Sequence, residues 1–212
     1  MVSEEDIISC FGIYDKLGKK TKELLIKNAY KKSFLKGMQL SVEYRGALLC
    51  VKKGAINVFS VGENGGAVFL YKLQKEDCMI VKGAKEYEFA TGTELIILDR
   101  AYVGILLSSG HTAENFLLKA ELKTQENIIN QFNMIMFTSL DARLSGFLLD
   151  AGMKSHGHPI SFTHEQIARF IGSSREVVSR KLKLYEEEGI LEVGRGKVYI
   201  KNREFLKKKR DI

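Results

Sequence analysis

Residues 163–191 read THEQIARFIGSSREVVSRKLKLYEEEGIL, and this stretch predicts two short helices joined by a tight turn. Thr163 is a residue type that caps helices, and Gly172 stops the first helix after its apolar repeat. Ser174 can cap a second helix that begins at Arg175. The apolar residues of both helices recur at helical spacing, and they are Ile167, Phe170, Ile171, Val178, Leu182 and Tyr185. The stretch therefore predicts a helix-turn-helix with one face packed inward.

The polar face of the second helix predicts contact with double-stranded DNA. In helix-turn-helix proteins the second helix enters the major groove, and its first residues contact base edges. A solvated surface helix also carries charges, but it does not predict the short first helix, the glycine turn and the polar cluster together. The predicted base-reading residues are Arg175, Glu176, Ser179 and Arg180. The predicted contacts to DNA phosphates are Thr163, His164, Ser174, Lys181, Arg195 and Lys197.

The net charge of +7 is concentrated near the carboxyl end. Residues 159–212 hold 13 Lys and Arg against 8 Asp and Glu, a net of +5, whereas residues 1–158 have a net of only +2. This distribution is typical of a domain that binds phosphates. The run Lys207–Arg210 alone is usually a solvated tail, but beside a helix-turn-helix it predicts added affinity for any DNA sequence.

Several classes of protein are disfavoured by the composition. No apolar run is long enough to span a bilayer, and residues 1–6 lack a signal-peptide pattern, so we expect a cytoplasmic protein without a membrane partner. Cys10, Cys50 and Cys78 are dispersed, so we expect reduced and mostly buried thiols. His156 and His158 lie in a polar loop before Pro159, where a plain hinge is favoured over a metal site.

The first half of the chain predicts a helical start followed by strands. Residues 4–30 have a helical pattern, and residues 34–98 form short apolar runs punctuated by glycine. Asn64 and Gly65 lie between two such runs and favour a tight hairpin turn. Strands at this spacing predict a β-sandwich or jelly roll.

Residues 113–137 predict one long helix with a heptad seam. The seam residues are Leu118, Leu122, Gln125, Ile129, Phe132 and Met136. A helix folded onto its own domain is the alternative, but the length of the seam favours a dimer helix. A second helix over 140–151, a loop over 152–159, a hairpin wing over 190–200 and a short helix after Asn202 complete the prediction.

The order of these parts and the sequence FTHEQIARFIGSSREVVSR at 162–180 resemble the bacterial catabolite activator and fumarate-nitrate regulator (Crp/Fnr) family of transcription factors. The match is specific over 139–206. The resemblance implies an α+β chain: an N-terminal β-jelly-roll sensor domain of the cyclic-nucleotide-binding type at 1–111, a dimerisation helix at 112–138, and a winged helix-turn-helix domain at 139–212.

The resemblance also implies how DNA is read. Arg175, Glu176 and Arg180 match the base-reading residues of the catabolite activator motif, while Glu176, Ser179 and Arg180 match the Glu-x-x-Ser-Arg set of the fumarate-nitrate branch. It implies a homodimer on a palindromic site with TGA-like half-sites about one helical turn apart. RNA polymerase as a partner, and activation of transcription, are implied by the resemblance alone.

The sensor region departs from the family's best-known members. Residues 75–89 are short and contain no Arg to hold a phosphate, so we do not expect cyclic AMP to bind. Only Cys10 lies near the N-terminus, so a cysteine cluster for iron–sulfur binding is missing. Haem is an alternative with Cys78 or Met79 as ligand, although the region has no histidine, and we predict no cofactor. Cys78 as a redox-active thiol and Lys82 as an anion contact are further alternatives to a buried, inert Cys78.

Two other functions compete with that of a DNA-binding regulator. A cupin-like metal enzyme would gather histidines on its strands, but no histidine occurs before His111, and no P-loop, HExxH or nucleophile elbow is present. We therefore do not expect an enzyme. A constitutive regulator, whose sensor domain binds no ligand, stays open.

Overall fold

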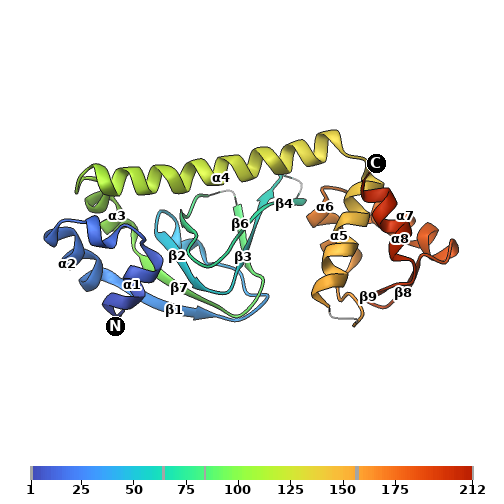
Figure 1. The fold of residues 1–212 in the computed structure, drawn as a ribbon, viewed down its shortest axis with the longest axis horizontal. Coiled ribbons are helices and arrows are strands. Elements are labelled where there is room, and N and C mark those ends of the chain that lie inside the picture. The colour runs from blue at the N-terminus through green and yellow to red at the C-terminus, as the bar shows by residue number, and fades with distance from the viewer. Residues whose placement is uncertain (1, 64, 84, 156–157, 212) are drawn as a thin grey trace. The chain divides into compact units, whose positions relative to one another are not determined.

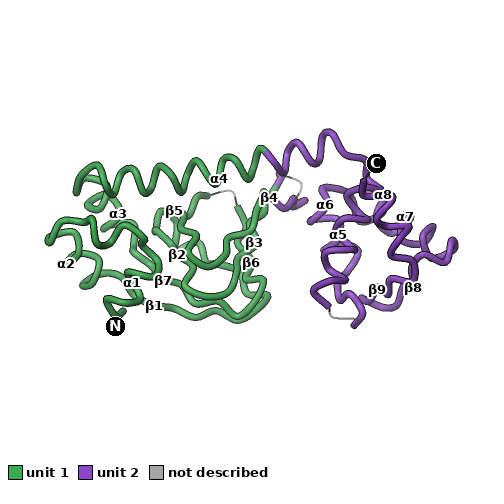
Figure 2. Tube along the Cα trace, viewed as in Figure 1, with its two compact units in different colours: residues 1–61, 70–129 green, residues 62–69, 130–212 purple. Residues whose placement is uncertain are grey.

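The computed structural model describes residues 2–63, 65–83, 85–155 and 158–211. The chain divides into two compact units (Figure 2). Unit 1 comprises residues 1–61 and 70–129, and unit 2 comprises residues 62–69 and 130–212. Of the sequence-based expectations, Asn64 in the hairpin turn and His156 in the polar loop lie outside the described residues.

Unit 1 combines two β-sheets with flanking helices (Figure 1). Its elements, with η for a 3-10 helix, are α1 (Glu4–Cys10), η1 (Tyr14–Lys16), α2 (Lys19–Asn28), β1 (Ala29–Phe34), η2 (Val42–Tyr44), β2 (Leu48–Lys53), β3 (Ile56–Val61), β4 (Ala67–Leu73), β5 (Cys78–Ile80), β6 (Lys85–Phe89), β7 (Thr93–Leu98), α3 (Arg100–Leu107) and α4 (His111–Phe137). The elements β4 and α4 continue into unit 2. The domain limits predicted at residues 111 and 138 stay predictions.

The helical pattern expected over residues 4–30 is confirmed for most of the range, but it is divided among α1, η1 and α2 and ends at Asn28, before β1. Ser3 caps α1 by accepting a hydrogen bond from the Asp6 N–H, and α1 ends at Cys10. Gly18 is the N-cap of α2, and the chain turns into β1 at Ala29. The apolar spacing is helical, but it does not reveal the break between two short helices.

The strands form a sandwich, as the sequence predicts. One sheet has the order β1-β7-β2-β5 and the other the order β4-β3-β6. Alternate residues of β7 face opposite sides: Leu95 and Ile97 belong to the core shared by the two sheets, whereas Ile96 and Leu98 belong to a core shared with α1 and α2. Both faces of this strand are buried, which is why it reads as a continuous apolar run.

The expected hairpin joins β3 to β4. The strands are neighbours in the sheet, and the Gly65 N–H donates to the Gly62 carbonyl oxygen at 2.9 Å. Strand alternation before the turn and glycine within it therefore predicted this element correctly.

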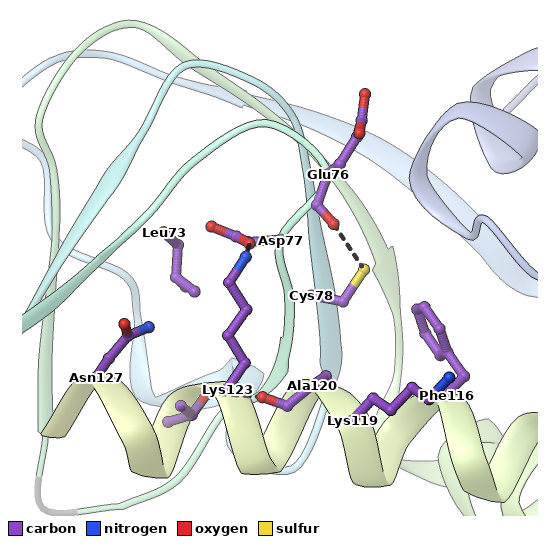
Figure 3. A pocket seen from close by; sticks show the side chains of 10 residues that line it. Leu73, Glu76, Asp77, Cys78, Phe116, Lys119, Ala120, Lys123 and Asn127 are labelled. Atoms are coloured by element: carbon purple, nitrogen blue, oxygen red, sulfur yellow. Dashed lines mark hydrogen bonds and ion pairs between the residues drawn. The ribbon is translucent and has the colours of Figure 1, made fainter. Parts of the chain in front are cut away.

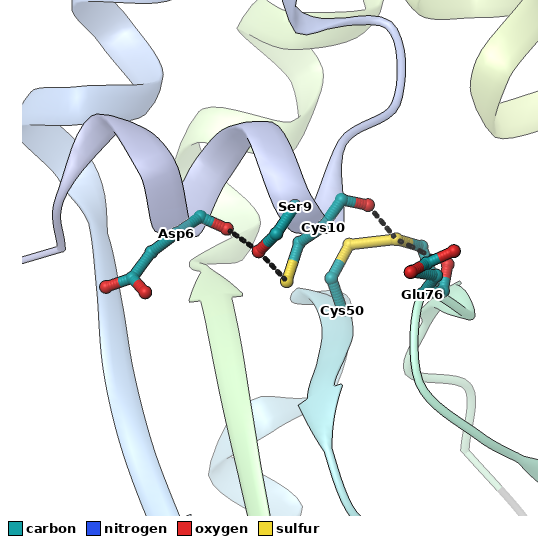
Figure 4. Close-up of a disulfide and its surroundings, with 6 residues drawn as sticks. Asp6, Ser9, Cys10, Cys50 and Glu76 are labelled. Atoms are coloured by element: carbon teal, nitrogen blue, oxygen red, sulfur yellow. Dashed lines mark hydrogen bonds between the residues drawn. A yellow bond between two sulfur atoms is a disulfide. The ribbon is translucent and has the colours of Figure 1, made fainter.

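The expectation of three reduced thiols is corrected by the structure. Cys50 and Cys78 are joined in a disulfide, and Cys10 is a free, buried thiol (Figure 4). Cys50 of β2 stands directly opposite Cys78 of β5 in the antiparallel register. The 28-residue separation hides this pairing, because it depends on how two distant strands align.

Unit 2 carries the predicted helix-turn-helix and wing. Its further elements are α5 (Leu140–Lys154), α6 (His164–Ile171), α7 (Arg175–Glu187), β8 (Leu191–Gly194), β9 (Lys197–Ile200) and α8 (Arg203–Arg210). Strands β8 and β9 pair antiparallel as the wing, and the Asn202 side chain caps α8. Helices α5, α6, α7 and α8 share one core centred on fully buried Leu144, Leu182 and Leu206.

Among the described residues, no helix is both long and apolar enough to span a membrane. In the same part of the chain, no three His, Cys, Asp or Glu side chains gather where a metal ion could bind.

Candidate DNA-binding site

The first helix of the motif, α6, is fixed at both ends by local hydrogen bonds. The Thr163 hydroxyl accepts from the Gln166 N–H at 3.1 Å, and the Gln166 side chain accepts from the Thr163 N–H at 2.9 Å. This reciprocal pair is a capping box. Gly172 ends the helix with φ 65° and ψ 53°, a left-handed conformation that favours glycine. The sequence therefore predicted both boundaries.

The second helix, α7, buries one face and exposes the predicted reading face. Ser174 caps it by accepting from the Val177 N–H at 3.4 Å. The apolar residues expected to point inward, Val178, Leu182 and Tyr185, are at most 2% exposed. Arg175, Glu176 and Arg180 are exposed to solvent. Their side chains can therefore reach a groove without disrupting the core.

Ser179 differs from the other three predicted reading residues. It is only partly exposed, and its hydroxyl lies 2.7 Å from Nδ1 of His164 on α6. This hydrogen bond links the two helices of the motif. Ser179 thus has a positioning contact within the protein, in addition to its predicted role on DNA.

Glu176 is prepared to act as a hydrogen-bond acceptor. Its own backbone N–H and the Ser174 hydroxyl bond the carboxylate and lower its pKa, and the charges of Arg175 and Arg180 act in the same direction. A carboxylate that stays ionised can accept from the N4 amino group of cytosine. The flanking guanidinium groups can donate to guanine.

Five of the six predicted phosphate contacts divide into two groups. Thr163, His164 and Ser174 make the capping and helix–helix bonds described above, so their side chains already have partners in the protein. Arg195 and Lys197 are exposed on the wing, at the tip of the β8–β9 hairpin. The wing residues are therefore the members of the set most open to a phosphate, and the role of all six stays a prediction.

Lys181, the sixth predicted phosphate contact, belongs to a partly buried network that sequence reasoning missed. Its ammonium group lies 2.8 Å from Asp141 of α5, and the Tyr185 hydroxyl donates to the same carboxylate at 3.0 Å. Burial raises the pKa of Asp141, but the hydrogen bonds from Lys181 and Tyr185 outweigh burial and leave this pKa below its ordinary value. The network holds α7 against α5. Only the inward spacing of Tyr185 hinted at it, because its hydroxyl needs a partner.

The seam predicted on α4 faces solvent in the single chain. Helix α4 packs on unit 1 through Ala113, Leu117 and Thr124, which are at most 7% exposed. The apolar seam residues are all more than half exposed: Leu118, Leu122, Ile129, Phe132 and Met136. Gln125 is exposed as well. The helix therefore covers its own unit with one face and leaves the apolar seam on another.

The two predicted sensor residues are already engaged. Lys82 forms an ion pair with Glu121 of α4, and its backbone N–H donates to the Tyr87 hydroxyl at 3.0 Å. Cys78 is bonded to Cys50. Neither therefore presents a free ligand atom in this structure.

Three comparisons relate this geometry to known proteins. Residues 142–209 match the family of Crp-like helix-turn-helix domains. No curated protein sequence matches the chain. Among solved structures, a transcriptional regulator from Eubacterium rectale ATCC 33656, assigned to the crp/fnr family, is 24% identical to this chain in sequence. The match covers 95% of this chain and 99% of that chain, with a TM-score of 0.85.

Two further solved structures share the fold at lower identity. TTHA1359, a CRP/FNR-family transcriptional regulator from Thermus thermophilus, is 19% identical over 86% of this chain and 99% of its own, with a TM-score of 0.66. The c-di-GMP responsive global regulator CLP of Xanthomonas campestris is 14% identical over 86% of this chain and 99% of its own, with a TM-score of 0.67. The predicted resemblance is therefore confirmed: residues 142–209 match the family of Crp-like helix-turn-helix domains, and the chain shares the α+β fold of solved Crp/Fnr-family regulators.

Proposed function

We propose that this protein is a homodimeric transcription regulator that binds a palindromic DNA site by inserting α7 of each subunit into the major groove. The observation that carries the proposal is that α7 has one buried and one exposed face. Val178 and Leu182 are buried, whereas three side chains near the N-terminus of α7 are exposed: Arg175, Glu176 and Arg180. Side chains in that position contact base edges in helix-turn-helix complexes.

The dimer in this proposal forms through the seam of α4. Burying five half-exposed apolar side chains against a second copy removes apolar surface from water, which stabilises association. Two recognition helices related by a two-fold axis then require two half-sites, with centres about 34–36 Å apart. By resemblance, we propose TGA-like half-sites, activation through RNA polymerase, and control by a signal received at unit 1.

Selection of binding sites from random DNA with the purified full-length protein tests the reading face. We expect paired half-sites in inverted repeat. Arg180→Ala should lose about 5- to 150-fold in discrimination at one base pair of each half-site, because a bidentate contact to guanine is worth about 1–3 kcal/mol. Lys183→Ala is the matched control, since Lys183 is exposed on the same helix and pairs with Glu187. Unrelated or single half-sites, or equal effects of both variants, would contradict the proposal.

The dimer is tested separately by light scattering of the full-length chain. Ile129→Glu places a charge in the seam and should convert the dimer to a monomer. Glu126→Lys changes charge at an exposed α4 position outside the seam, so it should leave the dimer intact. An unchanged mass for Ile129→Glu would refute the seam.

A further inference from the structure

The Cys50–Cys78 disulfide closes the edge of a sheet in unit 1 (Figure 4). Strand β5 is the outer strand of its sheet and is three residues long. It is aligned to β2 by three residue pairs, of which Cys50 and Cys78 form the last. Breaking this bond would therefore remove the covalent link between the two strands and leave their backbone pairing in place, including the bond from the Val51 N–H to the Asp77 carbonyl oxygen.

Cys78 is the more exposed of the two bonded cysteines. Cys50 is fully buried, whereas Cys78 is 6% exposed and lines a pocket of about 180 Å³ (Figure 3). Lys119 and Lys123 of α4 line the same pocket. Glu76 and Asp77 line it as well, and Lys123 pairs with Asp77, so Lys119 is the lysine whose charge can favour the approach of a thiolate, the attacking form in thiol–disulfide exchange.

The surroundings of Cys78 also suit the reduced state. Its sulfur lies 3.4 Å from the Cys10 carbonyl oxygen and 3.9 Å from the Glu76 carbonyl oxygen. A thiol formed at Cys78 can donate to either oxygen, so reduction leaves no buried polar group at Cys78 without a partner. Burial raises the pKa of the nearby Cys10 thiol, which therefore stays protonated and unreactive.

The turn that carries Cys78 is tied directly to α4. Asp77 pairs with Lys123 of α4 at 2.5 Å, and the Glu76 N–H donates to the Val51 carbonyl oxygen at 2.8 Å. Lys123 is adjacent to the seam residue Leu122. A shift of this turn would therefore change the Asp77–Lys123 ion pair on the helix that presents the proposed dimer seam.

We propose that Cys50 and Cys78 form a reversible thiol–disulfide site, reduced by soluble dithiols, whose state changes DNA affinity through the Asp77–Lys123 contact. A thiolate of the dithiol bonds to the Cys78 sulfur, the Cys50–Cys78 bond breaks, and Cys50 leaves as a thiolate that takes up a proton. The second thiol of the dithiol then displaces Cys78, which takes up the second proton, and the dithiol departs as a disulfide. Two electrons and two protons pass to the protein.

The link to DNA affinity rests on the proposed function. A DNA-binding regulator works beside the chromosome, where thiols are kept reduced and disulfides are as a rule transient and redox-sensing. A disulfide in such a protein is therefore better explained as a site that changes state than as a permanent crosslink.

Counting thiols in the full-length protein tests the site without DNA. Reduction or oxidation is carried out in native buffer, the reagent is removed, and every free thiol is then alkylated in denaturant and counted by mass spectrometry. Protein treated with oxidised glutathione should carry one alkylated cysteine, Cys10, and protein treated with dithiothreitol should carry three. Removing the dithiol and restoring oxidised glutathione should return the count to one. Reduction that needs denaturant would overturn the proposal, because the bond would then be a structural crosslink.

DNA affinity of the two states tests the coupling. We expect at least about a fivefold difference in Kd for the selected site, the lower end of ordinary coupling between sites. Lys123→Ala should keep the thiol counts and lose most of this difference, whereas Lys119→Ala, on the same pocket, should keep both. Cys10→Ala should respond as the unchanged chain does. Equal DNA affinity of the oxidised and reduced proteins would overturn the coupling. If neither form binds DNA, the proposed function is overturned, and the thiol count alone decides whether the thiol–disulfide site is reversible.

Discussion

Replacing Gly172 with alanine tests the turn that sets α7 against α6. Gly172 has φ 65° and ψ 53°, and its N–H bonds the Ala168 carbonyl oxygen at the end of α6. A Cβ placed there would lie 2.8 Å from Cδ1 and 3.0 Å from Cγ1 of Ile135. Both the backbone conformation and this close approach therefore disfavour a side chain at position 172.

The expected cost has two parts. The left-handed conformation costs an L-residue about 1–2 kcal/mol. The overlap involves the flexible end of Ile135, which can move aside by leaving its rotamer at a cost of about 0.5–1.5 kcal/mol. Gly172→Ala should therefore destabilise unit 2 by roughly 1.5–3.5 kcal/mol. Gly196 is the matched control, because it has φ 66° and a Cβ added to it would meet nothing within 4 Å, so Gly196→Ala should cost only the first part.

Hydrogen exchange followed by mass spectrometry is the suitable assay, because it reports local opening free energies within a two-unit chain. Peptides from α6 and α7 of the full-length protein should lose protection in Gly172→Ala by more than in Gly196→Ala. Adding Ile135→Ala to each variant should remove the difference between them. Equal losses in the two single variants would refute the role of Ile135, and no loss in either would refute the conformational argument.

Two further predictions concern charge. The pKa of Asp141 lies below its ordinary value, so the contribution of Asp141 to stability is present above the unfolded-state pKa and is lost as pH falls through the folded-state pKa. Asp141→Asn should therefore flatten the loss of stability below about pH 4, measured by urea unfolding. An unchanged acid dependence would count against the Lys181–Asp141 network. Lys207, on the basic end of α8, pairs with Glu204 at 2.7 Å, but both side chains are exposed and the pair can open to a phosphate. Lys207→Ala should therefore weaken binding to all DNA sequences and lower the salt slope by at most about one. A changed base preference in filter-binding titrations would instead assign Lys207 to base reading.

The helix-turn-helix could be predicted because its signals are local. Thr163, Gly172 and Ser174 each act on backbone groups within a few residues, and the structure uses all three as expected. The same holds for Asn202 at the start of α8. Capping and turn chemistry depend on neighbours in the chain, so they can be read without knowing the fold.

The Cys50–Cys78 bond could not be predicted, because it depends on the register of two strands. The pairing of Cys50 with Cys78 follows from the alignment of β2 with β5, and a shift of one residue would turn one of them to the other face. The start of β1 at Ala29 is similar, since β1 is fixed by its pairing with β7. These features belong to the assembled sheet and leave little trace in local spacing.

The polar residues of the motif show where a sequence pattern stops being informative about roles. Lys181 and Arg180 are neighbours of the same charge, yet Lys181 pairs with Asp141 while Arg180 faces solvent. Helical periodicity turns successive side chains about 100° apart, so one neighbour meets α5 and the other does not. Charge predicts that a domain binds DNA, whereas the partner that each charge already has in the fold decides which residues are free to do so.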